Sequence, residues 1–413
     1  MAKLVYVARD SSGKKVSGSE EVSSPEDLVS RLQARNLIVI DILPEVKESR
    51  ISSQAEVVHV SSNRRMHGGV NEADLVLYCR QLATLLGAGV TILKSLEIIL
   101  KQVNSRRLYM IIKSMVKDME SGLSLHESMA KHSKIFSDLW VNLVESGEAS
   151  GNLAVVLNRL AGYLERNAEF KKKIISALIY PLILMFAGLG ALFFLTIKII
   201  PTFAVMFEGF KVELPLLTRI LIKTSTFLRH SSLPIFGILI VSIFLIRNYI
   251  KTKQGRRAFE GLLFKLPVFG DFFHALVVER FSSEMSTLVE SGVPILYSLE
   301  ITEHSVGNLV MADIVRQIKE SVREGKSLSQ QLEKSGFFEP MVVQMVAVGE
   351  EIGELAQMFK RINTFYEEYV GTFLIRFTSM FEPIVLLLMG GIIGLMVVGM
   401  FLPIFKIASV GGG

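Results

Sequence analysis

The chain of 413 residues has few of the side chains that disulfide and metal chemistry require, with one cysteine and seven histidines. The single cysteine, Cys79, cannot form an internal disulfide, and its amphipathic helical surroundings predict a buried core thiol. The histidines are dispersed, and His126 and His132 lack the i, i+4 spacing of a metal-binding helix. We therefore expect no metal and no other cofactor.

A catalytic motif is also missing. Gly325, Lys326 and Ser327 resemble the end of a phosphate-binding loop, but Glu320 stands where that loop needs its first glycine. A turn between two helices explains this tripeptide better, and no nucleophile, base and orienting group can be assembled elsewhere. We predict that the protein is not an enzyme.

Hydrophobic residues make up 50% of the chain and charged residues 21%, which indicates a membrane protein with large parts in water. The net charge of +5 is concentrated beside apolar segments. This distribution favours anionic lipid or an acidic partner, and no stacking aromatic residues accompany it to suggest nucleic acid.

One block of sequence occurs twice, at Thr84–Pro201 and again at Thr287–Pro403. In the first half of the block an offset of 203 residues aligns the copies, and after a one-residue deletion the offset is 202. The aligned identities include Gly122, Ser124, Leu125, Gly147, Glu148, Gly151, Pro181 and Pro201 with Gly325, Ser327, Leu328, Gly349, Glu350, Gly353, Pro383 and Pro403. The chain therefore contains an internal duplication.

Three segments are long and apolar enough to cross a bilayer, for which about 20 residues are needed. They are residues 174–200, 233–250 and 378–405. Basic residues precede the first and follow the second, which predicts cytoplasmic flanks, a cytoplasmic N-terminus and an external C-terminus. Residues 201–232 would then form a short external connection and residues 406–413 an external tail. The N-terminus is too polar for a signal peptide.

The remaining segments complete the expected organisation. Residues 1–44 alternate apolar and polar positions, turn at 11–14 and continue into a helix ending at Ala34 and a strand at Leu37–Ile42, which predicts a small α+β domain. Residues 45–70 have the composition of a linker. Residues 71–173 and 251–377 show helical spacing with short breaks, which predicts two cytoplasmic bundles. The fold class is therefore mainly α, with two repeated bundles, three transmembrane helices and a small N-terminal α+β domain.

Several motifs occur in the same order as in one known family. They are ArgGlnLeuAlaThrLeu at 80–85, GlyGluxxGlyxLeu at 147–153 and 349–355, TyrPro at 180–181, LeuProLeuLeuThrArg at 214–219, LeuProValPheGly at 266–270, GluPro at 382–383 and LeuProIlePhe at 402–405. The chain resembles the F-type platform proteins of type II secretion and type IV pilus machines, a bacterial inner-membrane family.

The resemblance implies a multi-pass protein of the bacterial inner membrane that assembles a fibre without catalysis of its own. Its implied partners are a cytoplasmic hexameric ATPase, pilin or pseudopilin subunits and other inner-membrane platform components. We also expect a homo-oligomer in contact with the lipid bilayer and no nucleic acid. The motifs leave open whether the machine is a pilus or a secretion system.

The two GlyGluxxGlyxLeu loops are the clearest polar candidates, with Gly147, Glu148 and Gly151 in one and Gly349, Glu350 and Gly353 in the other. The glycines suit the left-handed turn that ends a helix, so an architectural role is favoured over a direct partner contact. A cation site is weakly supported, because two acids supply too few oxygens for calcium. Replacing either glutamate by alanine is expected to disturb folding less than replacing the second glycine by valine.

Five residues are candidates for a membrane groove: Pro181, Glu382, Pro383, Gly390 and Gly394. The matched prolines are expected to kink the first and third spans. Glu382 suits the start of a membrane helix, as a cap or as a functional contact. Gly390 and Gly394 give a small-residue face for close packing, either within one protomer or between protomers. A transporter would need more polar groups near the membrane midplane, and a sensor would need a larger external domain.

Overall fold

The computed structural model describes residues 2–9, 15–22, 25–34, 37–44, 66–208 and 214–410. The chain divides into two compact units, Met1–Arg64 and Arg65–Gly413. The turn expected at 11–14 and most of the linker expected at 45–70 lie outside the described residues.

The first unit holds a three-stranded sheet and one helix. Its elements are β1 (Ala2–Arg9), β2 (Lys15–Val22), α1 (Pro25–Ala34) and β3 (Ile38–Pro44). The strand order is β2-β1-β3 and both pairings are antiparallel. Ala8, Val22 and Leu32 form its small core, because strand alternation and the helix direct them to the same side.

The second unit begins with a six-helix arrangement. Its elements are α2 (Glu72–Gly87), α3 (Ile92–Leu100), α4 (Arg106–Glu120), α5 (Leu125–Ala130), α6 (Asp138–Ala149) and α7 (Leu153–Phe194). Tyr78, Phe136 and Trp140 pack together in its core, with ring centroids 5.3–6.3 Å apart. Cys79 is buried as predicted and its thiol donates to the Leu157 carbonyl over 3.6 Å.

The second copy of the repeat builds an equivalent bundle, preceded by one extra helix. Its elements are α10 (Lys253–Leu263), α11 (Phe269–Glu290), α12 (Ile295–Ser305), α13 (Leu309–Arg323), α14 (Leu328–Lys334), α15 (Pro340–Ile352) and α16 (Leu355–Val410). In each bundle the first helix of the repeat packs against the long last helix, as α2 does on α7 and α11 on α16. Phe281, Phe338 and Phe359 occupy the centre of the second core.

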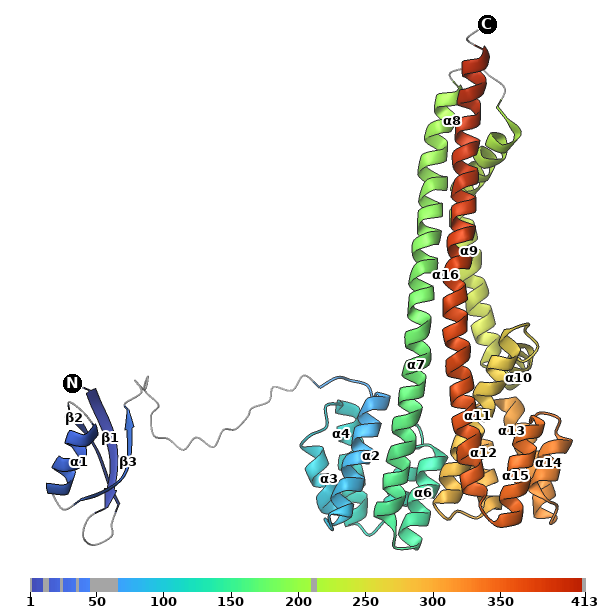
Figure 1. The fold of residues 1–413 in the computed structure, drawn as a ribbon. Helices are drawn as coiled ribbons and strands as arrows, with labels where there is room; N and C mark the ends of the chain where they lie inside the picture. The colour runs from blue at the N-terminus through green and yellow to red at the C-terminus, as the bar shows by residue number, and fades with distance from the viewer. Residues whose placement is uncertain are drawn as a thin grey trace. The chain divides into compact units, whose positions relative to one another are not determined.

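The two bundles are not separate bodies. Leu288, Val293 and Ile301 belong to the second copy but are buried in the core of the first. Phe170 of α7 is buried in the core of the second. The bundles lie side by side at the foot of α7 and α16 (Figure 1), and each core includes residues from outside its own bundle.

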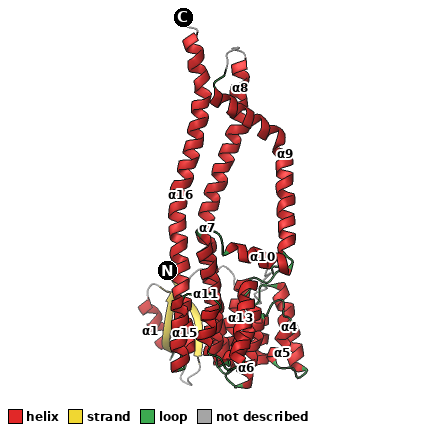
Figure 2. Ribbon diagram, turned by 90° about the vertical axis from the view of Figure 1, so that its right-hand side faces the viewer, coloured by secondary structure: helices red, strands yellow, loops and turns green. Residues whose placement is uncertain are grey.

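Two helices of the described chain are long and apolar enough to cross a membrane, Leu153–Phe207 and Leu355–Phe405. Within the first of them, a π-helical turn, η1 (Leu195–Ile199), joins α7 to α8 (Ile200–Glu208). Figures 1 and 2 show α7 and α16 rising from the bundles.

The connection between the two apolar helices is more helical than expected. Residues 201–232 were assigned to a short external connection, but α9 (Leu216–Ile250) already begins inside that range. It consists of Leu216–Ser231 and Pro234–Ile250, which meet at 62° and are long and apolar enough to cross a membrane only if the two together form one span. Pro234 explains the bend, because proline lacks an amide donor and clashes with the preceding turn.

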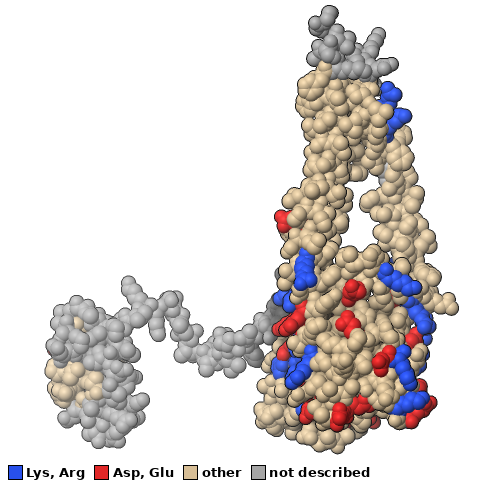
Figure 3. Space-filling view, turned by 45° about the vertical axis from the view of Figure 1, so that its right-hand side comes forward, with Lys and Arg blue, Asp and Glu red and all other residues tan. Residues whose placement is uncertain are grey.

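The surface of the second unit changes character along its length. Charged side chains cover the bundles, whereas the middle of the long helices is almost uncharged on the face shown in Figure 3. Phe186, Phe244 and Leu387 are 68%, 68% and 76% exposed there. An apolar surface of this extent is unsuited to water and matches a bilayer.

Candidate functional site

Glu148, in the last turn of α6, holds the first turn of α5. One carboxylate oxygen accepts from the amide of Leu125 over 2.8 Å, and the other accepts from the amide of His126 over 3.1 Å. The ring Nδ1 of His126 also contacts this second oxygen. Ser124 caps α5 by accepting from the amide of Glu127. The carboxylate therefore satisfies amides that have no partner inside their own helix.

Glu350 makes the equivalent contact in the second bundle. It accepts from the amides of Leu328 and Ser329 over 2.8 and 3.1 Å, and from the hydroxyls of Ser327 and Ser329 over 2.7 and 2.9 Å. Burial disfavours its charged form, but these four hydrogen bonds outweigh that effect and hold the pKa of Glu350 below its usual range. The Glu350 carboxylate thus ties α15 to the start of α14.

The glycines of the two loops have distinct tasks. Gly151 and Gly353 adopt φ values of +70° and +77°, the left-handed conformation in which a helix ends. Gly147 and Gly349 lie inside α6 and α15, where the next helix approaches closely. A Cβ on Gly147 would lie 3.1 Å from Leu153 Cα, and one on Gly349 would lie 2.8 Å from Met358 Cγ. Each loop therefore combines a close helix crossing, a carboxylate clamp and a helix end.

The sequence identified the two GlyGluxxGlyxLeu loops, but it did not predict which residues their glutamates contact. The contacts of Glu148 and Glu350 come from residues more than 20 positions earlier in the chain. A signal was present in the repeat, because Ser124 and Leu125 recur as Ser327 and Leu328 just as Glu148 recurs as Glu350. Among the described residues there is no group of three or more His, Cys, Asp or Glu placed to hold a metal ion.

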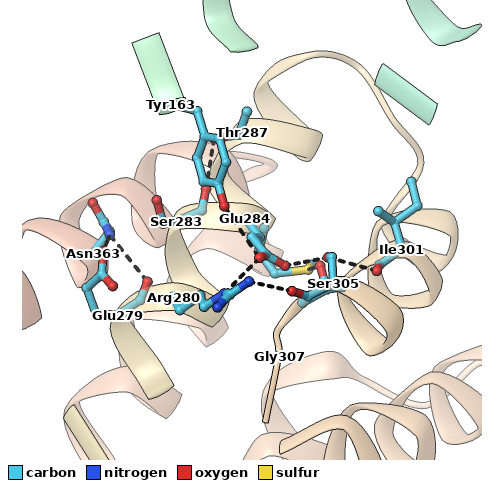
Figure 4. A network of polar contacts seen from close by, with 12 residues as sticks. Tyr163, Glu279, Arg280, Ser283, Glu284, Thr287, Ile301, Ser305, Gly307 and Asn363 are labelled. Atoms are coloured by element: carbon cyan, nitrogen blue, oxygen red, sulfur yellow. Dashed lines mark hydrogen bonds and ion pairs between the residues drawn. The ribbon is translucent and has the colours of Figure 1, made fainter. Parts of the chain in front are cut away.

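A second polar site, which the sequence did not suggest, lies where α7 meets α11 (Figure 4). Glu284 is only 1% exposed. Its carboxylate accepts from the Ser305 hydroxyl over 2.6 Å, from Arg280 Nε over 3.3 Å and from the Tyr163 hydroxyl over 3.4 Å. Burial raises the pKa of Glu284 even though these three groups favour its ionised form. The signal that could have revealed it is a carboxylate among the apolar positions of α11.

Glu279 lies five residues earlier on α11 and pairs with Asn363 of α16. The amide of Asn363 donates to its carboxylate over 2.9 Å and to its backbone carbonyl over 3.3 Å. Burial raises the pKa of Glu279 to about 7, and the nearby Glu367 acts in the same direction. The helix α11 thus carries two carboxylates in low-dielectric surroundings, one facing α7 and one facing α16.

The membrane candidates are distributed over both long helices. Pro181 lies inside α7 and Pro383 inside α16, and both helices continue past them. Tyr180, next to Pro181, shares a side-chain hydrogen bond with Glu382. Since Tyr180 and Glu382 occupy matching positions of the two repeats, this contact joins equivalent points of α7 and α16.

Gly390 and Gly394, predicted to support close packing within one protomer or between protomers, make no close contact with another helix of the described residues. A Cβ on Gly390 or Gly394 would meet no atom of another residue within 4 Å. The close approach occurs instead at Gly399, where a Cβ would collide with Leu221 and the carbonyl accepts from the Thr218 hydroxyl. Packing within the protomer therefore uses Gly399, and Gly390 and Gly394 remain open.

Comparison with known proteins agrees with this architecture. The family model described as protein F of the type II secretion system matches residues 78–201 and 281–403, and the model of its N-terminal domain matches residues 1–43. The two matches of one model confirm the internal repeat.

Relatives of full length come from two kinds of machine. The type IV pilus assembly protein PilC of Thermus thermophilus is 40% identical over 97% of each chain. The PilC of Myxococcus xanthus is 30% identical over 99% of this chain and 95% of its own. The type II secretion system protein F of Pseudomonas aeruginosa is 31% identical over 100% of both chains. The chain therefore belongs to the type II secretion system protein F family.

Proposed function

We propose that the protein is the inner-membrane assembly platform of a type IV pilus or type II secretion machine. In this role it couples a cytoplasmic hexameric ATPase to the insertion of pilin or pseudopilin subunits into a growing fibre, and it has no catalysis of its own. Its full-length relatives, named as pilus assembly and secretion system proteins, support this assignment.

The observation that carries the proposal is the continuity of α7 and α16. They have 42 and 56 residues and, at 1.5 Å per residue, extend about 63 and 84 Å. Each begins in the core of a bundle and ends in the apolar zone. A displacement of either bundle would therefore reach the membrane through a stiff helix.

The proposal includes a topology with three spans. We place both bundles, residues 71–173 and 251–377, in the cytoplasm with the N-terminus, and the C-terminus outside. The second half of α9 then serves as the return span between two parallel outward helices. The basic residues at its end, Arg247 and Lys251, support this orientation.

Topology is tested with reporters of compartment. A reporter after Ser231 is expected to be active only outside, and reporters at Gly255 or Glu333 only in the cytoplasm. An external signal at Glu333 would refute the three-span arrangement, because the second bundle would then lie outside.

Function is tested by deletion and crosslinking. Deletion is expected to abolish fibre assembly or secretion while the ATPase and the subunits remain intact. Photocrosslinkers on exposed bundle positions are expected to trap the ATPase, and those at Glu382 or Gly394 a pilin-like helix. ATP hydrolysis by the purified protein, or normal assembly in the deletion strain, would contradict the platform assignment.

A further inference from the structure

The helix α10 follows α9 after a sharp turn. Only Lys251 and Thr252 separate the two helices, and Thr252 caps α10 by accepting from the amide of Gly255 over 3.0 Å while donating to the Tyr249 carbonyl over 2.7 Å. A Cβ on Gly255 would collide with that carbonyl, so only glycine permits this approach. In Figure 2, α10 runs crosswise to α9 at its lower end.

One face of α10 is fixed to the second bundle. Arg256 donates to the Gly307 carbonyl and also pairs with Glu260 on its own helix over 2.8 Å. Glu260 accepts from the amide of Leu309, the first residue of α13. Arg257 pairs with Asp313 over 3.1 Å. These contacts set the rotation of α10 about its own axis.

The opposite face is apolar and exposed. On this face Phe259 is 39% exposed and Leu262 is 58% exposed, and just beyond the end of α10 Leu266 is 38% exposed. Gly255, Phe259 and Leu262 are spaced i, i+4 and i+7, so they lie on one stripe of the helix. Because Gly255 lies against the last turn of α9, this stripe faces the side from which α9 arrives.

The turn after α10 extends this apolar face. Val268 has a φ of +70°, which β-branched residues rarely adopt, and its side chain is 70% exposed. Gly270 leaves no room for a Cβ, which would collide with the Phe264 carbonyl. The LeuProValPheGly motif thus forms a tight turn that presents an apolar side chain outward beside Leu266.

Basic side chains accompany this face. Lys251 and Lys253 at the start of α10 and Lys265 at its end are exposed. Figure 3 shows Lys and Arg side chains on the bundle surface near the level where the uncharged zone begins. An amphipathic helix with an apolar face and flanking lysines has the composition of helices that lie in the surface of an anionic bilayer.

We propose that α10 and the following turn lie in the cytoplasmic surface of the bilayer, with Phe259, Leu262, Leu266 and Val268 among the acyl chains and the lysines on anionic headgroups. The inference rests on the proposed function, because it needs α9 to be a membrane span. The continuity of α10 with α9 and the charge of its flanks select lipid as the occupant over a second protein. The second bundle would then be seated on the membrane by α10 as well as by α16.

The test uses the full-length protein in nanodiscs of anionic and zwitterionic phospholipid. In a background with Cys79→Ala, single cysteines replace Leu262, Leu387 or Glu324 and carry an environment-sensitive fluorophore. Lipids with a nitroxide near the headgroup are expected to quench position 262 roughly threefold more strongly than position 324, as for a shallowly inserted helix. Lipids with a nitroxide deep in the acyl chain are expected to quench position 387.

A second arm tests the charge. The combined variant Lys251→Gln, Lys253→Gln and Lys265→Gln is expected to lose the stronger quenching of position 262 by anionic over zwitterionic nitroxide lipid. An unchanged preference would overturn the headgroup contact.

The possible outcomes distinguish a failure of the membrane placement of α10 from a failure of the proposed platform function. Quenching at 387 without any at 262 would overturn the membrane placement of α10 and leave the platform assignment standing. Disulfide formation between copies through the unlabelled cysteine at position 262 would show that a second copy covers the face, which also overturns the inference. No quenching at 387 would contradict the proposed membrane spans themselves.

Discussion

The Tyr163 hydroxyl of α7 donates to the buried carboxylate of Glu284 on α11 over 3.4 Å, which joins the two repeats by a polar contact. Around it, Leu288 and Val293 of the second copy are buried in the core of the first. An apolar interface without direction could slide, whereas this hydrogen bond fixes one register. A sliding motion of one bundle against the other would therefore have to break the hydrogen bond between Tyr163 and Glu284.

Replacing Glu284 by alanine is expected to destabilise the protein by about 3 kcal/mol, because Arg280, Ser305 and Tyr163 lose a shared partner in a buried site. Tyr163→Phe removes only the long hydrogen bond and should cost about 1 kcal/mol. Thermal unfolding in detergent, followed by the fluorescence of the single tryptophan, Trp140, measures both. Equal effects of the two variants would show that Glu284 acts through Tyr163 alone.

Glu279 is expected to make stability depend on pH near neutrality. Its pKa of about 7 in the folded protein exceeds the unfolded value of roughly 4.3. The folded state therefore binds the proton more tightly, and the stability this provides is present below the unfolded pKa and lost as pH rises through 7.

Glu279→Gln removes this dependence, because the amide stays neutral and keeps an acceptor for Asn363. We expect the variant to be more stable than the parent at pH 8 and similar at pH 5, as measured by Trp140 unfolding midpoints at both values. A parallel loss of stability at both pH values would contradict the buried-carboxylate explanation.

The clamps at Glu148 and Glu350 are expected to matter for folding. Their loop positions alone suggested a mild effect of alanine substitution, but their contacts lead us to expect a loss of about 1–3 kcal/mol, since each removal leaves amides of a neighbouring helix without a partner. Glu148→Ala should lower the Trp140 transition, because that residue reports on the first bundle. Glu350→Ala should increase hydrogen exchange in α14.

Glu351→Ala is the matched control, because this exposed neighbour has no hydrogen bond to α14 among the contacts of the described residues. The pKa of Glu350 is lower in the folded protein than in the unfolded chain, where it is roughly 4.3, so the clamp stabilises the fold in a pH-dependent way. The stabilisation is present above the unfolded pKa and is lost as the pH falls through the lower folded pKa. Unchanged exchange in Glu350→Ala at pH 7 would rule out the clamp.

Gly151→Val and Gly353→Val are each expected to cost about 1–3 kcal/mol, because a β-branched residue is strained at positive φ. Gly87→Ala provides the control, since Gly87 is helical and has open space around it. That change should be neutral or stabilise by up to about 1 kcal/mol. Unfolding midpoints of the three variants decide between backbone strain and a general intolerance of loop substitution.

The sequence predicted those features of the fold that depend on local periodicity and on the internal repeat. Helical spacing, the glycine-ended loops and the buried Cys79 all follow from residues close in sequence. The pairing of Glu148 with the start of α5, and of Glu284 with Tyr163, depends on contacts between residues 22 and 121 positions apart. The spacing of residues in the sequence does not show which distant residues are in contact, so the buried Glu284 could not be distinguished from an exposed glutamate. The helical first half of α9 was missed because residues 201–232 were assigned to a connection by their position between two predicted spans.

The last prediction distinguishes the packed and the open glycines of α16. Gly399→Val is expected to disrupt the fold, because its side chain would collide with Leu221 and displace the Thr218 hydroxyl from the Gly399 carbonyl. Gly390→Val is expected to leave the fold unchanged, because the space around that position is open. Yield of folded protein and the Trp140 unfolding midpoint measure both effects.

Fibre assembly in cells then tests whether the open face of α16 at Gly390 contacts another membrane helix. If Gly390→Val folds normally but blocks fibre assembly, the open face of α16 contacts another membrane helix, either a subunit or a second copy, as small residues at helix interfaces do. If it folds and assembles normally, the open face is filled by lipid, and the groove proposed for pilin-like subunits has to lie elsewhere. A folding defect in Gly390→Val equal to that of Gly399→Val would contradict the packing of α16 against α9.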